Sequence, residues 1–269
     1  PGVSSGTMAF ILGIYEELIL SIRNVGRGEF WQALLRGKFR TACRSIHASF
    51  LLAVGSGILF AVLTLSRGLE FMLYHHPVVI WSFFFGLVLA STVVVGKRVS
   101  QWTITLFIAV LLGALFAYGI VGLVPLHTPD LSWFLVLSGA IAICATILPG
   151  ISGAFVLVLL GKYEFILKAI NDRDITSIGY VALGAVLGMV LFSQVLSWLL
   201  RKYYNLTVAF LTGFMMGSLR KIWPWKIGNS NVIPDIVEGV VPTPEFMTGL
   251  GFILCGILIV LIIDRTAKR

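Results

Sequence analysis

Two similar stretches carry the residues best suited to binding chemistry: PGVSSGTMAFILGIYEEL at residues 1–18 and PGISGAFVLVLLGKYEFI at residues 149–166. Each is typical of a helix start, because proline suits the first turn and serine caps free N–H groups. A helix N-terminus presents those donors and a partial positive charge to an anion. The predicted phosphate-binding residues of the two stretches are Ser4, Ser5, Gly6, Thr7, Ser152 and Gly153. The alternative is that Pro-Gly only ends one helix and lets two helices pack closely.

Each stretch also carries one glutamate at the matching position, Glu16 in the first and Glu164 in the second. Each lies about four helical turns beyond its proline. Ionisable groups within apolar segments are costly and usually functional, so these two predict ion coupling or gating. The alternative is a carboxylate at the membrane surface. Glu17 aligns with Phe165 and is the weaker candidate of the adjacent pair.

A third stretch, GFMMGSLRKIWPWK at residues 213–226, places Arg220 and Lys221 at the end of an apolar segment. Arginine can hold a phosphate through two parallel hydrogen bonds, so the pair is predicted to bind a phosphate. The alternative is a pair of surface bases beside an interfacial belt formed by Trp223 and Trp225. Lys162 is interpreted as a lysine whose ammonium extends to the membrane surface. The alternative is that it pairs with a carboxylate or with the substrate.

Histidine and cysteine do not add a second chemistry. The three cysteines lie far apart, and neither they nor the four histidines have the spacing of metal ligands. No phosphate-cradling loop and no nucleophile with a histidine partner is visible. No metal site, cofactor or catalytic residue is therefore predicted, which argues against an enzyme.

The composition is that of a membrane protein. Of the 269 residues, 58% are hydrophobic and 12% are charged, whereas soluble domains carry about 25% charged residues. Apolar runs of roughly 17–25 residues recur, as a bilayer requires. The formal charge of +8 is assigned to loops that set topology rather than to nucleic-acid binding.

Continuously apolar runs predict helices, since helices satisfy their own backbone in lipid. The predicted fold is all-α and polytopic. Its apolar segments are expected at 8–22, 46–73, 77–96, 102–124, 131–148, 154–170, 177–200, 206–222 and 246–263. Residues 23–45 read as a cytoplasmic amphipathic helix at the membrane surface, with apolar residues near helical spacing among basic ones.

The two stretches head two repeats. Residues 1–22 align with 149–170 without gaps, and three apolar segments follow each. We therefore expect repeats at 1–124 and 131–269, each of about five segments, the first helix of repeat 1 being absent from the chain. An odd number of segments predicts inverted topology, as in many secondary transporters. Segments 131–148 and 154–170 are short, which favours a re-entrant hairpin broken at the Pro-Gly motif. Placing residues 23–44 and the C-terminus in the cytoplasm puts most loop lysines and arginines there.

The three motifs, PGVSSGT, PGISGAF and GFMMGSLRKIWPWK, resemble those of the polyprenyl-phosphate transporter family, over essentially the whole chain. Family members usually read PGVSGGT, so Ser5 is a departure. The resemblance implies a bacterial cytoplasmic membrane protein that returns undecaprenyl phosphate from the outer to the inner leaflet for envelope polymer synthesis. It further implies coupling to H⁺ or Na⁺.

Three other functions stay open on the sequence alone: a transporter of a small soluble anion, a membrane-embedded lipid phosphatase and a structural scaffold. The partners expected are a polyprenyl-phosphate lipid and the membrane, without nucleic acid. A homodimer is one oligomeric state that the sequence leaves open, together with the coupling ion and the lipid chain length.

Overall fold

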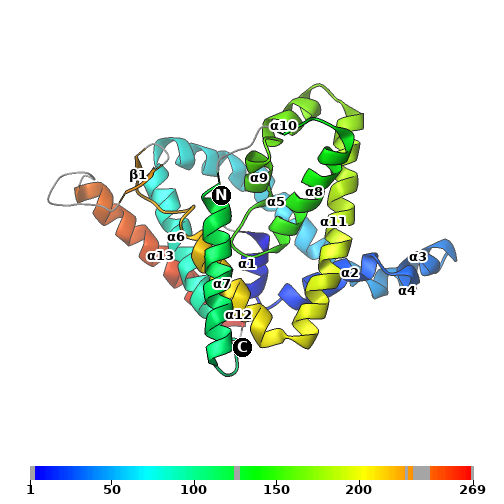
Figure 1. Ribbon diagram of the computed structural model, residues 1–269, viewed down its shortest axis with the longest axis horizontal. Helices are drawn as coiled ribbons and strands as arrows, with labels where there is room; N and C mark the ends of the chain where they lie inside the picture. Colours follow the sequence, from blue (N-terminus) through cyan, green and yellow to red (C-terminus); the bar gives the residue numbers. More distant parts are fainter. Residues whose placement is uncertain (1–3, 124–127, 228–229, 233–242, 268–269) are drawn as a thin grey trace.

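The computed structural model describes residues 4–123, 128–227, 230–232 and 243–267, and they form an almost entirely helical fold (Figure 1). The helices are α1 (Ser5–Ile11), α2 (Tyr15–Val25), α3 (Gly28–Leu35), α4 (Phe39–Ser45), α5 (Ala48–His75), α6 (Pro77–Gly96), α7 (Ile104–Val121), α8 (Ser132–Ile147), α9 (Gly153–Leu159), α10 (Tyr163–Asn171), α11 (Ile175–Lys202), α12 (Tyr204–Ser218) and α13 (Thr243–Ala267). Two short strands, β1 (Lys226–Ile227) and β2 (Ser230–Asn231), pair antiparallel. The all-α prediction is confirmed.

Five of the described helices, α5, α6, α7, α11 and α13, are long and apolar enough to cross a membrane. Many of their large apolar side chains are exposed in the isolated chain, for example Leu63 of α5 and Phe107 of α7. Lipid would cover such side chains in a bilayer. The backbone N–H and C=O groups of these helices are bonded within each helix, so they do not need water. The chain is a multi-pass membrane protein.

Three pairs of helices pack most closely, α6 with α13, α7 with α12 and α8 with α11, and the helices of each pair run parallel. Glycines make this approach close. A Cβ on Gly213 of α12 would lie 1.9 Å from the Val110 carbonyl oxygen of α7, and one on Gly184 of α11 would lie 1.8 Å from that of Val136. Small residues at helix interfaces are the usual means by which membrane helices pack, since lipid supplies little hydrophobic drive between them.

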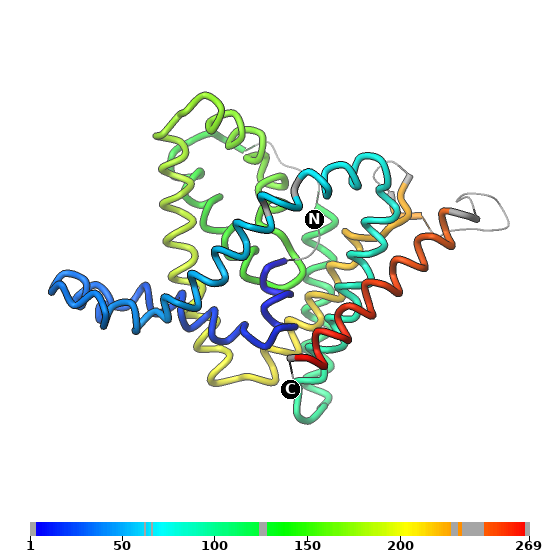
Figure 2. The backbone as a smooth tube through the Cα atoms, turned by 180° about the vertical axis from the view of Figure 1, so that it is seen from behind, coloured from blue at the N-terminus to red at the C-terminus, as the bar shows by residue number. Residues whose placement is uncertain are grey.

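The middle of the molecule holds the short helix α1 (Figure 2). It contacts α2, α6, α8 and α13. Phe10 of α1 and Tyr15 of α2 stack with ring centroids 3.8 Å apart, inside the largest cluster of buried apolar residues. Helix α1 is therefore fixed by packing on several sides.

The two repeated stretches adopt the same local conformation. Ser4 and Ser152 are the N-caps of α1 and α9, and each side chain accepts a backbone N–H from the first turn. Gly13 and Gly161 then end these helices with φ of 74° and 64°, a region that favours glycine. The expected single segments 8–22 and 154–170 are therefore wrong in one respect, because each is broken into two helices at its glycine. Pro1 and Gly2 lie outside the described residues.

The segment 23–45 also differs from the expected single helix. Helix α2 continues to Val25, and the rest forms α3 and α4, which meet at Gly37 with φ of 68°. These two helices project from the body of the molecule in Figure 1. Leu35 and Phe39 are exposed on them, as expected of apolar side chains that enter a membrane surface. The glycine explains the break.

Close backbone packing gives a direct test. We expect Gly184→Ala to lower the stability of the protein by about 1–3 kcal/mol, because the new methyl group overpacks the contact with α8. Gly179→Ala, in the same helix, is the control, since no atom lies within 4 Å of its added Cβ. The apparent melting temperatures of the two variants in detergent measure the difference. Equal values would contradict the close α8–α11 contact.

Candidate functional site

The turn between α8 and α9 packs directly on the end of α12. Gly150 in this turn has φ of 99°, and a Cβ there would lie 2.7 Å from the Ser218 hydroxyl oxygen and 3.1 Å from the Met215 Cα. Ser152 then accepts the Phe155 N–H at 3.4 Å and begins α9. Glycine is required at 150 for both its conformation and its space. The turn 148–152 and α12 are therefore locked together at this point.

Helix α1 begins against the same turn from the other side. The Ser4 hydroxyl lies 2.9 Å from the Thr146 carbonyl and 2.8 Å from the Leu148 carbonyl, so it can donate to either. The Thr7 hydroxyl accepts the Gly150 N–H at 3.1 Å, and Thr7 is fully buried. A Cβ on Gly6 would lie 2.3 Å from the Ile147 carbonyl oxygen. These groups hold the turn, and Ser5 is the exposed member of the set.

Three cations gather where α12 ends: Arg220, Lys221 and Lys226, named here the α12 C-terminal cluster. The Lys221 ammonium lies 4.3 Å from the ring centroid of Phe155 in α9, which brings it beside the turn 148–152. The Arg220 guanidinium lies 4.2 Å from the ring centroid of Tyr118 at the end of α7. Lys226 lies over Trp81 of α6. The structure thus places the predicted Lys221 beside the first turn of α9, which the predicted Ser152 caps, whereas the predicted Arg220 lies against the end of α7.

No carboxylate of a described residue pairs with the α12 C-terminal cluster, since the ion pairs in that part of the chain are Glu17–His47 and Lys162–Asp130. Burial lowers the pKa of Lys221, and burial together with the charge of Lys221 lowers the pKa of Lys226. Desolvated like charges disfavour their own ionised forms, and a bound anion would relieve this. The cluster is therefore suited to an anionic ligand.

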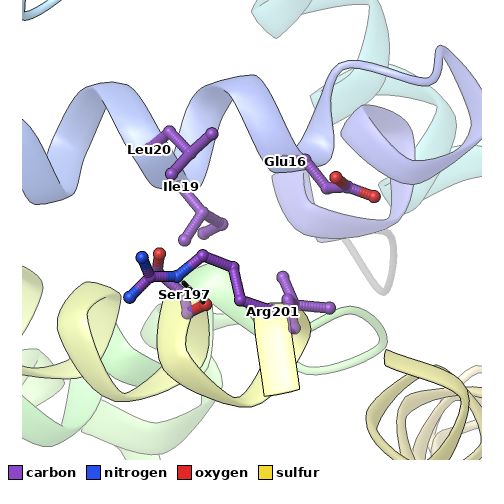
Figure 3. Close-up of a pocket in the computed structure, with 6 residues that line it drawn as sticks. Glu16, Ile19, Leu20, Ser197 and Arg201 are labelled. Carbon is purple, nitrogen blue, oxygen red and sulfur yellow. Dashed lines mark hydrogen bonds between the residues drawn. The ribbon is translucent and has the colours of Figure 1, made fainter. Parts of the chain in front are cut away.

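Glu16 lies away from this cluster. It lines a small pocket of about 70 Å³ with Ile19, Leu20, Ser197, Leu200 and Arg201, named here the Ser197 pocket (Figure 3). Tyr204 interacts with both Glu16 and Arg98 at one side of this pocket. Glu16 and Glu164 are both exposed and lie in the first turns of α2 and α10, but Glu164 does not line this pocket. The two predicted glutamates thus have different surroundings, although their positions in the two stretches match.

Lys162 corrects an interpretation made from the sequence. Its side chain is 1% exposed and does not reach the surface. The ammonium donates to the Thr128 carbonyl at 2.8 Å and forms an ion pair with Asp130, while the rings of Phe134 and Phe165 lie alongside. A buried lysine without a partner would be costly, so the loop before α8 supplies one. The carboxylate alternative is the correct one.

Several residues with contacts of interest escaped the sequence analysis. Arg23, Arg98 and Arg201 entered it only as loop charges that set topology, and Ser197 did not enter it. A pattern of basic residues at segment ends gives no sign that two of them converge on one serine. Glu17 contacts the Nδ1 atom of His47 at 3.1 Å, which gives the less favoured glutamate a structural partner. Within the described residues, no group of three or more histidine, cysteine, aspartate or glutamate side chains could hold a metal ion.

The buried lysine generates a prediction. We expect Asp130→Asn to lower stability by about 1–3 kcal/mol, because it leaves a buried charge without its counter-charge. Lys162→Met should cost less than Asp130→Asn, since an apolar side chain can replace a buried ion pair. Asp172→Asn, an exposed site in the same region, is the control. Thermal unfolding in detergent compares them, and a larger loss in Lys162→Met than in Asp130→Asn would contradict the role of the pair.

The comparisons with known proteins agree with the family resemblance of the three motifs. Residues 1–238 match the family described as undecaprenyl phosphate translocase-like. A Vibrio cholerae protein named polyprenyl-phosphate transporter is 39% identical over 288 residues, covering 100% of this chain and 92% of that protein. A Staphylococcus aureus protein of the same name is 27% identical over 242 residues, covering 83% and 81%. No solved structure matches the chain. The chain therefore belongs to the undecaprenyl phosphate translocase-like family, a family of translocases rather than enzymes.

Proposed function

We propose that this protein moves undecaprenyl phosphate from the outer to the inner leaflet of the bacterial cytoplasmic membrane, for reuse in envelope polymer synthesis. Its family and the names of its two relatives support the substrate. The observation that carries the proposal is the α12 C-terminal cluster. Its three cations pair with no carboxylate of the described residues, and Lys221 among them lies beside the turn 148–152. A phosphate headgroup has the charge and the acceptors that such a cluster needs.

Arg220 and Lys221 supply most of the binding energy for the phosphate in this proposal. Helices α1 and α9 have seven residues each, so their N-termini add less. Ser152 and Gly153 lie beside Lys221 and complete the site. Ser4, Gly6 and Thr7 position the turn, because their groups already contact it. Ser5 is exposed and stays a candidate contact. The polyprenyl tail remains in lipid beside the helices.

Two inverted repeats, 1–124 and 131–269, would supply the two states that transport requires. The matching N-caps and glycine breaks support the repeats. The corners between α5 and α6 and between α11 and α12 have similar backbone angles, with φ of -136° and -133°. Under this assignment α6 corresponds to α12 and α7 to α13. The pseudo-symmetry therefore relates the closely packed pair α6–α13 to the closely packed pair α7–α12. The start of α1 at Ser4 and the turn before Ser152 would then lie at the tips of re-entrant hairpins, and one repeat would rock against the other.

Glu16 is the coupling residue in this proposal. It lies beside Arg98 and Tyr204, so a change in its charge can alter contacts of α2 with α12 and with the loop after α6. Glu164 stays the second candidate, with an exposed side chain. The side of residues 23–44 is assigned to the cytoplasm by the distribution of basic residues. Lys268 and Arg269, which contribute to that distribution, lie outside the described residues.

Flipping in proteoliposomes tests the headgroup site. We expect Arg220→Gln and Lys221→Gln each to slow the movement of undecaprenyl phosphate by roughly ten-fold or more, the effect of losing one charge-assisted hydrogen bond. Lys168→Gln, an exposed cation of α10, is the matched control. The fraction of lipid accessible to an added phosphatase reports the leaflet. Wild-type rates in both variants would refute the site, and an inactive wild-type protein would refute the function.

The same vesicles separate the rival functions. A transporter of a small soluble anion would accumulate inorganic phosphate without moving the lipid. A lipid phosphatase would release phosphate from undecaprenyl phosphate with no added enzyme. Either result would replace the proposed function.

Coupling has its own test. We expect Glu16→Gln to abolish the stimulation of flipping by an imposed H⁺ or Na⁺ gradient, because the variant can no longer gain or lose the charge. Glu17→Gln is the control, since it changes the adjacent residue, whose side chain contacts His47 instead. Rates are measured with each gradient separately. Stimulation that persists in Glu16→Gln and disappears in Glu164→Gln would move the role to Glu164.

A further inference from the structure

Two guanidinium groups from different helices bond to Ser197, and that of Arg201 lines the Ser197 pocket. Arg23 of α2 donates from Nη1 to the Ser197 hydroxyl at 3.4 Å. Arg201 of α11 donates from Nε to the Ser197 backbone carbonyl at 3.3 Å, one helical turn along. Figure 3 shows the Arg201 guanidinium beside Ser197, facing α2. Both guanidinium groups therefore hydrogen-bond to the same residue of α11.

These two arginines have no counter-charge in the part of the chain that the structure describes. The ion pairs there involve Glu17 and Asp130, with other cations. Glu16 lies at the far end of the pocket from the Arg201 guanidinium in Figure 3, on the side of Arg98 and Tyr204. Burial, followed by the charges of Arg27 and Arg201, lowers the pKa of Arg23. Like charges so placed gain free energy when an anion binds between them.

The pocket suits a headgroup and excludes a bulky ligand. Its volume of about 70 Å³ has room for several water molecules but not for a polyprenyl chain. Ile19, Leu20 and Leu200 form its apolar walls, and Leu20 is partly exposed at 38%. A lipid with one small anionic group could place that group at Ser197 and its first apolar carbons along Leu20.

We propose that the Ser197 pocket is a second binding site for a phosphomonoester headgroup, held by Arg23 and Arg201 at the end of α12 opposite the α12 C-terminal cluster. The inference rests on the proposed function for the identity of the lipid. Helix α12 begins just after α11 and leads to the α12 C-terminal cluster, and its 15 residues span about 22 Å. The pocket would receive the headgroup on the side assigned to the cytoplasm, before the lipid leaves the protein.

Binding to the purified full chain in detergent tests this site. The probe is farnesyl phosphate, a short polyprenyl phosphate, titrated and followed by thermophoresis. The starting protein carries Arg220→Gln, Lys221→Gln and Lys226→Gln, so that the α12 C-terminal cluster is removed. Adding Arg201→Gln should weaken the remaining binding by about ten-fold, the loss of one bidentate phosphate contact. Adding Arg23→Gln should weaken it similarly and gives a second variant if the first does not fold.

The matched control is Lys202→Gln, which removes a neighbouring cation that lies over Trp198 and Tyr203 instead. It should leave the affinity within about two-fold, far below the effect of a lost charge-assisted contact. Inorganic phosphate and phosphatidylglycerol are titrated in parallel arms. If both bind more weakly than farnesyl phosphate, the result supports a polyprenyl phosphomonoester as the ligand. If either one binds more tightly than farnesyl phosphate, that assignment is overturned.

Unchanged affinity in both arginine variants would overturn the pocket, and so would absence of farnesyl phosphate binding to the starting protein. Wild-type flipping is measured on the same preparation. Flipping with unchanged affinities refutes the pocket and leaves the proposed function standing. If the arginine variants lose affinity as expected but the wild-type protein does not flip the lipid, the proposed function is refuted and the pocket is not.

Discussion

Most of this structure depends on the contact between one turn and two helices. The turn 148–152 is held by Thr7 and Ser4 of the first stretch and by Ser218 and Met215 of α12. Gly150 is buried, so its N–H needs an acceptor within the protein, and the Thr7 hydroxyl supplies it. Helix α1, α8, α9 and α12 are therefore positioned relative to one another through backbone groups, and Lys221 comes beside α9 as a consequence.

The described residues hold one ion pair between a lysine or arginine and a carboxylate, that of buried Lys162 with Asp130. Arg220, Lys221 and Lys226 at one end of α12, and Arg23 and Arg201 near the other, have no such partner among the described residues. Arg201, Arg220 and Lys221 are exposed, and an anionic ligand could supply the counter-charge that the described residues do not. Both proposed sites rest on that missing counter-charge and on the contacts with Phe155 and Ser197, and each can be removed without the other.

The sequence predicted local structure well where one residue decides it. The range 77–96 was predicted as a helix and is α6, because Pro77 begins it and the run is apolar throughout. The caps at Ser4 and Ser152 follow from the Pro-Gly-x-Ser pattern. Gly13, Gly37 and Gly161 were the signals for helix ends, and their importance was underestimated.

Tertiary contacts were harder to predict. Nothing in the spacing of Arg23 and Ser197, far apart in the chain, indicates that their side chains meet. The burial of Lys162 likewise depends on Asp130 and Thr128 in the loop before α8. Of the candidate site, the sequence supplied the residue types, and the packing of α2, α11 and α12 decided which of them lie together.

The length of α12 bears on the energy of moving a charge. Its 15 residues span about 22 Å, whereas the hydrocarbon layer is about 30 Å thick. If the proposed sites mark the route, a headgroup beside α12 is in low-dielectric surroundings over a shorter distance than one that crosses free lipid. The Born penalty for an ion falls where polar protein groups and thinned lipid replace hydrocarbon. In the proposed mechanism, a short helix with cations near both ends would thus lower the barrier to crossing without a continuous aqueous pore.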